Sequence, residues 1–136
     1  MKYKEILVEK GYSQVHGIAC NETFAPLAKM DPIRLDLTIA ALKQWEVHHV
    51  DVKCAFLHGD INEDIYMHQP QGFVSNPSFV CRLKKSLYGL KQAPRAWYAK
   101  IDGFLLSLSF VRRKYDSNVY LKLIHGSLMI IVFIFV

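Results

Sequence analysis

The chain has 136 residues, enough for one domain with its own hydrophobic core and without stabilising disulfides or metals. Hydrophobic residues make up 51% of it and charged residues 21%, which excludes a disordered tail and a fibrous repeat. The formal net charge of +5 permits a polyanionic partner but does not require one. The three cysteines lack zinc-ligand spacing, so we expect a reduced, intracellular chain. The longest apolar run, residues 128–136, is too short to span a membrane, so we expect no membrane segment.

A short strand and a helix are the first elements predicted along the chain. Residues 3–8 form a strand candidate that ends at Lys10-Gly11. Asp31 and Pro32 predict a helix start, because aspartate can cap free backbone N–H groups and proline fits a first turn. Apolar residues then cover so much of the helix circumference that we expect the helix to be well buried, although Asp36 lies among them.

The rest of the chain predicts strands around a second helix. Residues 47–56, 63–68 and 79–83 are strand candidates, and Pro94 begins a helix with one apolar face over three turns. Residues 118–123 and 128–136 predict a hairpin that turns at residues 125–127. The order of strand, helix, strands, helix and strands predicts an α+β fold.

Asp51 is the first candidate for chemistry. It is a carboxylate within an apolar stretch, between Val50 and Val52. A carboxylate held on a strand suits Mg²⁺, which prefers hard oxygen ligands. Taken alone, a water-facing residue on an edge strand is the simpler interpretation.

The second candidate is the stretch of residues 86–97. Gly89 lies between a predicted strand and a predicted helix, where a missing side chain lets the backbone approach a ligand closely. Lys91 and Arg95 place positive charge near the start of that helix, where amide groups already favour anions. A plain turn with solvated basic residues is the alternative, and composition alone favours it.

Several strings together resemble the reverse transcriptase region of copia-type LTR retrotransposon Pol polyproteins. They occur in that family's order and spacing and extend over essentially the whole chain. The strings are residues 22–30, 49–60, 65–67, 69–73 and 80–98. The resemblance implies the fingers and part of the palm of a right-hand polymerase, with residues 1–46 fingers-like and residues 47–136 containing palm and fingers elements.

The resemblance also implies roles for individual residues around a Mg²⁺ site. Asp51 matches the metal-binding, catalytic aspartate of the first palm motif, and the backbone carbonyl of Val52 would be a second ligand. Phe56 matches the aromatic residue under the incoming sugar, where a bulky ring excludes a 2′-hydroxyl by collision.

A second group of residues is implied to contact the nucleotide. Gly89, Lys91 and Pro94 match the family's Gly-x-Lys-x-x-Pro motif along the nucleotide and template, and Tyr88 precedes that glycine. Lys4 remains in the fingers string and is expected to be a nucleotide-binding residue. The implied partners are an RNA template, a DNA primer and deoxynucleoside triphosphates.

Three departures from the family pattern affect these expectations. Ile6 replaces an arginine of the fingers, and Ser109 stands where a glycine usually ends the second helix. Residues 134–136 resemble the lead-in to the Tyr-Val-Asp-Asp box, and the sequence stops before its two aspartates. We therefore expect one of three catalytic aspartates, a fragment that is inactive alone, and pairing of residues 128–136 beside residues 47–52 that brings Val136 near Asp51.

Three functional interpretations follow. The first is a reverse transcriptase that is active with the residues present. The second, which the departures favour, is a catalytically dead retroelement remnant with weak affinity for nucleic acid. The third is a generic basic binding module unrelated to polymerases. On the resemblance we expect an intracellular, cytoplasmic location in particles, whereas the sequence indicates no oligomeric state.

Overall fold

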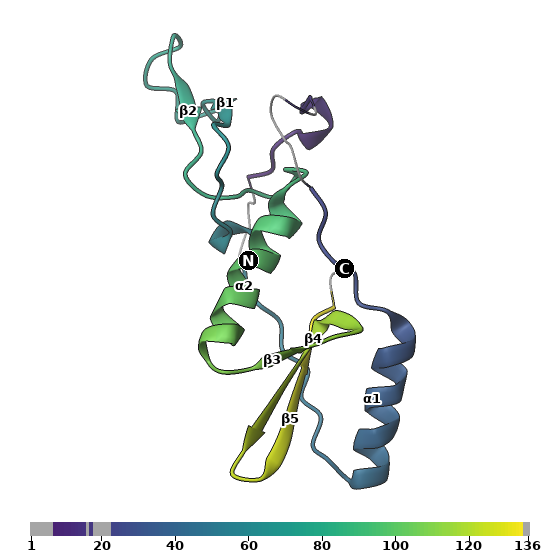
Figure 1. Ribbon diagram of the computed structural model, residues 1–136. Helices are drawn as coiled ribbons and strands as arrows, with labels where there is room; N and C mark the ends of the chain where they lie inside the picture. Colours follow the sequence, from purple (N-terminus) through teal and green to yellow (C-terminus); the bar gives the residue numbers. More distant parts are fainter. Residues whose placement is uncertain (1–6, 16, 18–22, 135–136) are drawn as a thin grey trace, which may run out of the picture. The chain divides into compact units, whose positions relative to one another are not determined.

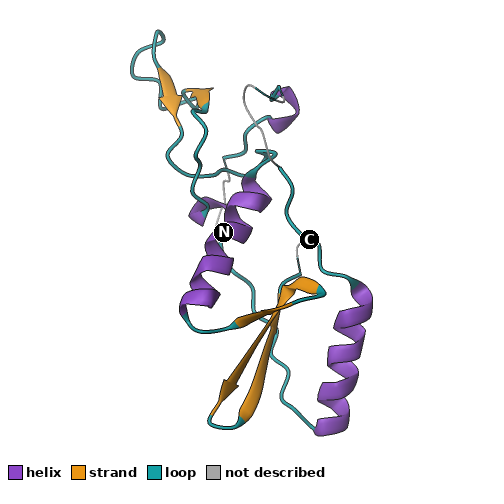
Figure 2. Cartoon of the chain, viewed as in Figure 1, coloured by secondary structure: helices purple, strands orange, loops and turns teal. Residues whose placement is uncertain are grey.

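The computed structural model describes residues 7–15, 17 and 23–134. These residues form an α+β arrangement, as the sequence predicts (Figures 1 and 2). The elements are the short 3₁₀ helices η1 (Gly11–Ser13) and η2 (Ala55–His58), the helices α1 (Met30–Lys43) and α2 (Ala93–Ser107), and the strands β1 (Tyr66–His68), β2 (Val80–Arg82), β3 (Val111–Arg113), β4 (Asp116–Ile124) and β5 (Ser127–Val132). No helix among the described residues is long and apolar enough to cross a membrane.

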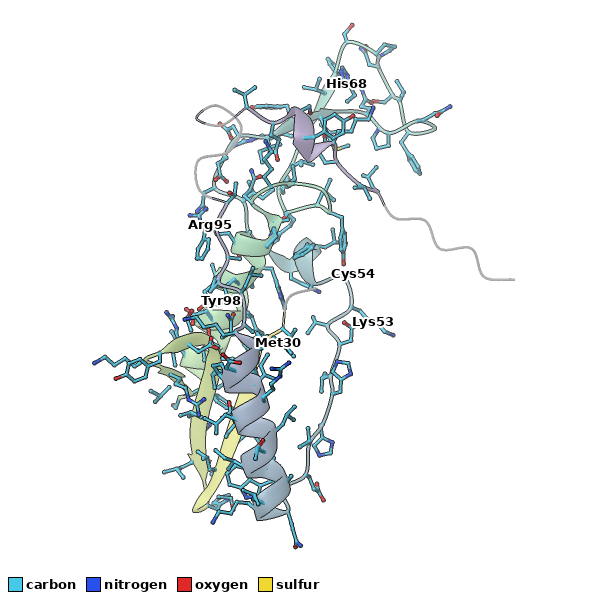
Figure 3. The ribbon with its side chains drawn as sticks, turned by 90° about the vertical axis from the view of Figure 1, so that its right-hand side faces the viewer. Met30, Lys53, Cys54, His68, Arg95 and Tyr98 are labelled. Atoms are coloured by element: carbon cyan, nitrogen blue, oxygen red, sulfur yellow. The ribbon has the colours of Figure 1, made fainter. Side chains whose placement is uncertain are left out.

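The chain divides into two compact units, each built from two separate stretches of sequence. Unit 1 comprises residues 1–25 and 54–100, and unit 2 comprises residues 26–53 and 101–136. One boundary falls between Lys53 and Cys54, which Figure 3 labels. A second falls between residues 25 and 26. The third falls inside α2, so that this helix contributes its first half to unit 1 and its second half to unit 2.

Unit 1 has a small core around the start of α2. Ile65, Leu90 and Ala93 are buried together, and the partly buried Phe56 and Leu87 are among the side chains that pack against them. β1 and β2 pair as an antiparallel hairpin in which Met67 faces Cys81. The strands predicted at residues 63–68 and 79–83 are therefore confirmed, although each is three residues long.

Unit 2 contains a three-stranded antiparallel sheet with β4 in the centre. The β4–β5 hairpin confirms the predicted turn, because Ile124 pairs with Ser127 across His125 and Gly126. Both turn residues have positive φ, 48° and 81°, as a tight two-residue hairpin requires. The core of this unit joins Leu105 of α2, Phe110 and the fully buried Tyr120.

The prediction for α1 is right in place and wrong in detail. The helix begins at Met30 with Lys29 as its N-cap residue, which makes no side-chain cap, so Asp31 lies in the first turn and is not the cap. The negative carboxylate of Asp31 still interacts favourably with the positive end of the helix dipole. The expected burial is also wrong, because Leu37 is 51% exposed and Leu42 is 79% exposed.

The buried face of α1 combines two apolar residues with one aspartate. Ile33, Asp36 and Ala40 are its buried residues, and Arg113 of β3 donates to both carboxylate oxygens of Asp36, at 3.0 and 3.1 Å. A charge-assisted pair of this geometry explains why an aspartate lies among apolar residues on this helix.

The strand predicted at residues 47–56 is absent. Residues 45–52 have no regular structure, and residues 55–58 form η2 instead. A stretch with apolar alternation forms a strand only if a neighbouring strand hydrogen-bonds to its backbone N–H and C=O groups. In this stretch Val47 and Val50 are 63% and 78% exposed, so their side chains are not packed in a core. The expected pairing of this stretch with the C-terminal strand is therefore wrong, since β5 pairs with β4. Val136 lies outside the described residues.

Candidate nucleotide-binding site

The structure brings Phe56 and Tyr88 together in unit 1. Phe56 lies in η2, and its ring meets the Tyr88 ring edge to face, with centroids 5.1 Å apart and planes at 62°. The resemblance places Phe56 under the sugar of an incoming nucleotide and Tyr88 directly before the glycine of the nucleotide motif. Both rings are partly exposed, so they form a small aromatic surface beside Gly89.

Gly89 is required by the chain's own backbone. Its φ is +90°, and a Cβ there would lie 1.9 Å from the carbonyl oxygen of Glu9. Gly11 is equally constrained, because its Cβ would lie 1.8 Å from the carbonyl oxygen of Gly89. The backbone N–H of Glu9 donates to Tyr88 at 2.8 Å, and Val8 forms a parallel bridge with Tyr88. The segment of residues 8–14 therefore lies against the loop of residues 88–92, which we call the Gly89 loop.

Lys91 is held by the same segment through Gln14. The backbone N–H of Lys91 donates to the Oε1 of Gln14 at 2.9 Å, and its Nζ donates to the backbone carbonyl of Gln14 at 2.9 Å. The Nε2 of Gln14 in turn donates to the Oε1 of Gln92 at 3.1 Å. Gln92 is 1% exposed and Lys91 is exposed, so Gln14 bonds to one buried and one exposed residue of the loop. No composition or spacing signal points to Gln14, because its role depends on two distant segments meeting.

Acidic side chains pair with several of the basic residues near this loop. Asp60 accepts hydrogen bonds from Lys85 and, at 2.9 Å, from Lys100. These bonds, from Lys85 first and Lys100 second, lower the pKa of Asp60 from its ordinary value of 3.8 to about 2. Arg95, labelled on α2 in Figure 3, lies 3.8 Å from Glu63. Lys85 and Arg95 are therefore partly neutralised as phosphate ligands.

Two cavities among the described residues of unit 1 are lined by residues other than Phe56, Tyr88 and Lys91. A polar cavity of about 60 Å³, lined by Asp60, Glu63, Gln92 and Arg95 among others, has room for water and not for a nucleotide. A larger cleft of about 280 Å³ is lined by residues of two stretches, 61–64 and 82–84.

Asp51 and Val52 belong to the other unit. Both are exposed and lie in the stretch without regular structure that precedes η2. Among the described residues there is no group of three or more histidine, cysteine, aspartate or glutamate side chains able to hold a metal ion. The described residues thus do not fit a complete Mg²⁺ site, since Asp51 offers a single exposed carboxylate. Lys4 lies outside the described residues.

Comparison with known proteins agrees with the motifs around these residues. Residues 1–136 match the family described as reverse transcriptase (RNA-dependent DNA polymerase). The chain belongs to the reverse transcriptase family. It is 47% identical over its whole length to the retrovirus-related Pol polyprotein from transposon TNT 1-94 of Nicotiana tabacum. It is 45% identical, over 88% of its length, to the corresponding polyprotein from transposon RE1 of Arabidopsis thaliana.

The chain corresponds to a reverse transcriptase segment of copia-type transposon Pol polyproteins. It spans 10% of the tobacco polyprotein and 8% of the Arabidopsis one. A Ty1-BL Gag-Pol polyprotein of Saccharomyces cerevisiae matches 52% of the chain at 37% identity. No solved structure matches. Reverse transcriptases are generally metal-dependent enzymes, which makes the single carboxylate at Asp51 notable.

Proposed function

We propose that this chain supplies the nucleotide-contacting and first metal-binding segments of an RNA-directed DNA polymerase. The observation that carries the proposal is the family match over residues 1–136, within which Phe56 and Tyr88 make a ring contact beside Gly89. The partners on this proposal are an RNA template, a DNA primer and deoxynucleoside triphosphates. Residues 1–46 would belong to the fingers, residues 47–136 to palm and fingers elements, and the protein would work in cytoplasmic particles.

The aromatic pair would recognise the sugar of the incoming nucleotide. Phe56 would lie under the sugar and exclude a 2′-hydroxyl by collision, and Tyr88 would fix the Phe56 ring through their edge-to-face contact at 5.1 Å. The Gly89 loop would lie along the nucleotide, while Lys91 and Lys4 would neutralise phosphate charge.

Asp51 would be one Mg²⁺ ligand, with the backbone carbonyl of Val52 beside it. One exposed carboxylate does not make a two-metal site. We therefore propose that these 136 residues bind a triphosphate weakly and extend no primer by themselves.

Two measurements on the purified chain test this proposal. Titration with dUTP and with UTP, which differ only in the 2′-hydroxyl, should show weak binding by NMR and a preference for dUTP that the Phe56→Ala variant loses. Primer extension on an RNA template with Mg²⁺ should give no product for the wild-type chain. Extension that disappears in Asp51→Asn would contradict the proposed inactivity, and a folded chain that binds neither nucleotide would contradict the nucleotide site.

A catalytically dead remnant with weak affinity for nucleic acid is the second candidate. The partial neutralisation of Lys85 and Arg95 by Asp60 and Glu63 favours low affinity. Binding should be indifferent to sequence and weaken steeply as salt rises, because phosphate contacts release counterions. Binding to RNA or DNA that is unchanged between low and high salt would contradict this candidate.

A further inference from the structure

Gln14 connects two segments of unit 1 that are 77 residues apart in sequence at Lys91. Its side-chain amide is used in both directions, since Oε1 accepts from the Lys91 N–H at 2.9 Å and Nε2 donates to Gln92 at 3.1 Å. An amide that both donates and accepts here fixes the relative position of the two segments more tightly than either bond alone. The partner Gln92 is 1% exposed, so an unmatched amide there would be costly.

The same contact determines where the charge of Lys91 lies. The Nζ of Lys91 donates to the backbone carbonyl of Gln14 at 2.9 Å. An ammonium group has three N–H donors, and this bond uses one of them. The long lysine side chain is therefore held in one place, while its remaining donors can serve an anion. Holding it beforehand lowers the entropy cost of binding that anion.

Backbone contacts place this arrangement beside the aromatic pair. The N–H of Glu9 donates to the carbonyl of Tyr88 at 2.8 Å, and Gly11 and Gly89 approach so closely that neither tolerates a Cβ. The segment of residues 8–14 thus contacts the Gly89 loop from Tyr88 to Gln92. Within this contact, Gln14 is the residue whose side chain reaches the lysine end of the loop.

We propose that Gln14 is a positioning residue for triphosphate binding, which holds the Gly89 loop so that the ammonium group of Lys91 stands ready for the phosphates. The inference rests on the proposed nucleotide function. It assigns to Gln14 no contact with the nucleotide itself. Its effect is exerted through Lys91, which makes the proposal testable by a double-mutant cycle.

The experiment measures dTTP and thymidine binding to the full chain by NMR titration. The variants are Gln14→Ala, Lys91→Ala and the double variant, with Gln14→Met in place of Gln14→Ala if the smaller side chain prevents folding. Gln69→Ala is the matched control, because Gln69 also bonds through its side chain to backbone groups, Asn76 and Phe79, in a different loop. Hydrogen exchange of the Lys91 amide measures whether the loop is still held.

Gln14→Ala should weaken dTTP binding about tenfold, leave thymidine binding unchanged and speed exchange of the Lys91 amide. In the Lys91→Ala background the same change should have little further effect. Equal loss for dTTP and thymidine, additive losses in the cycle, or the same loss in Gln69→Ala would overturn the proposal. If the wild-type chain binds no dTTP, the proposed function itself fails and the nucleotide role of Gln14 with it. If the wild-type chain binds dTTP and the Gln14 variants bind it equally well, only the positioning role of Gln14 fails.

Discussion

In unit 1 the Gly89 loop is fixed by a segment almost eighty residues away, whereas in unit 2 the stretch around Asp51 lies exposed and without regular structure. Both stretches belong to strings with a dense family resemblance. The difference is in what surrounds them: Gly89 lies against the backbone of Glu9, while Val50, next to Asp51, is 78% exposed. A motif therefore indicates ancestry equally in both places, but only contacts from other segments fix its geometry.

The two tryptophans of the chain allow each unit to be followed separately. Trp97 is buried in unit 1, and Trp45 belongs to unit 2. The Trp45→Phe and Trp97→Phe backgrounds each leave one reporter, so denaturant unfolding read by fluorescence assigns a loss of stability to one unit.

The largest expected effect comes from adding a side chain at Gly89. Gly89→Ala should destabilise unit 1 by about 3 kcal/mol or more, because left-handed strain adds to a clash with the carbonyl of Glu9. Gly72→Ala is the control, since Gly72 has a similar φ of +85° but nothing within 4 Å of its Cβ position. It should cost about 1 kcal/mol. Equal losses in the two variants would show that residues 8–11 do not lie against Gly89 in solution.

In unit 2 the ion pair of Asp36 and Arg113 holds α1 to β3, as Gly89 holds two segments together in unit 1. Asp36→Ala should destabilise that unit by about 2 kcal/mol, because it leaves the guanidinium of Arg113 half-buried without its carboxylate. Asp64→Ala, which removes the partner of Arg82 in unit 1, should cost about 0.5 kcal/mol or less, because both side chains are over 60% exposed. A small loss for Asp36→Ala would mean that α1 is not held to β3.

A smaller effect, of opposite sign, is expected at the end of α2. Ser109 has a φ of 64°, so it adopts the left-handed conformation that a glycine usually supplies at this point. Ser109→Gly should stabilise unit 2 by about 0.5 to 1 kcal/mol. Ser107→Gly, inside the last turn, should instead destabilise by a similar amount. Thermal unfolding of the two variants decides the sign.

The smallest expected effect is the pH dependence carried by Asp60 in unit 1. Its folded pKa of about 2 lies below its ordinary value of 3.8, so its contribution is fully present above about pH 4 and is lost as the pH falls towards 2. NMR titration of the Asp60 carboxyl should show the low pKa, and added salt should move it back towards 3.8, because the group is exposed. An Asp60 that titrates at its ordinary value would mean that Lys85 and Lys100 do not hold it.

The amino-acid sequence by itself determined the family, the α+β class and the elements whose signals are local. The helix at Pro94 and the turn at His125-Gly126 follow from backbone preferences of a few neighbouring residues, and both were predicted near their observed positions. The order of motifs along the chain also predicts Phe56, Tyr88, Gly89 and Lys91 as site residues, and these roles stay predictions.

Only the tertiary structure decided which of these residues meet and which patterns become structure. The alternation at residues 47–56 is a strand pattern without an observed strand, because pairing needs a partner that local sequence does not specify. The apolar circumference of α1 remains largely exposed, while Asp36 is buried because Arg113 reaches it. Gln14 carries no local signal, since its hydrogen bonds exist only after chain folding brings residues 14 and 91 together.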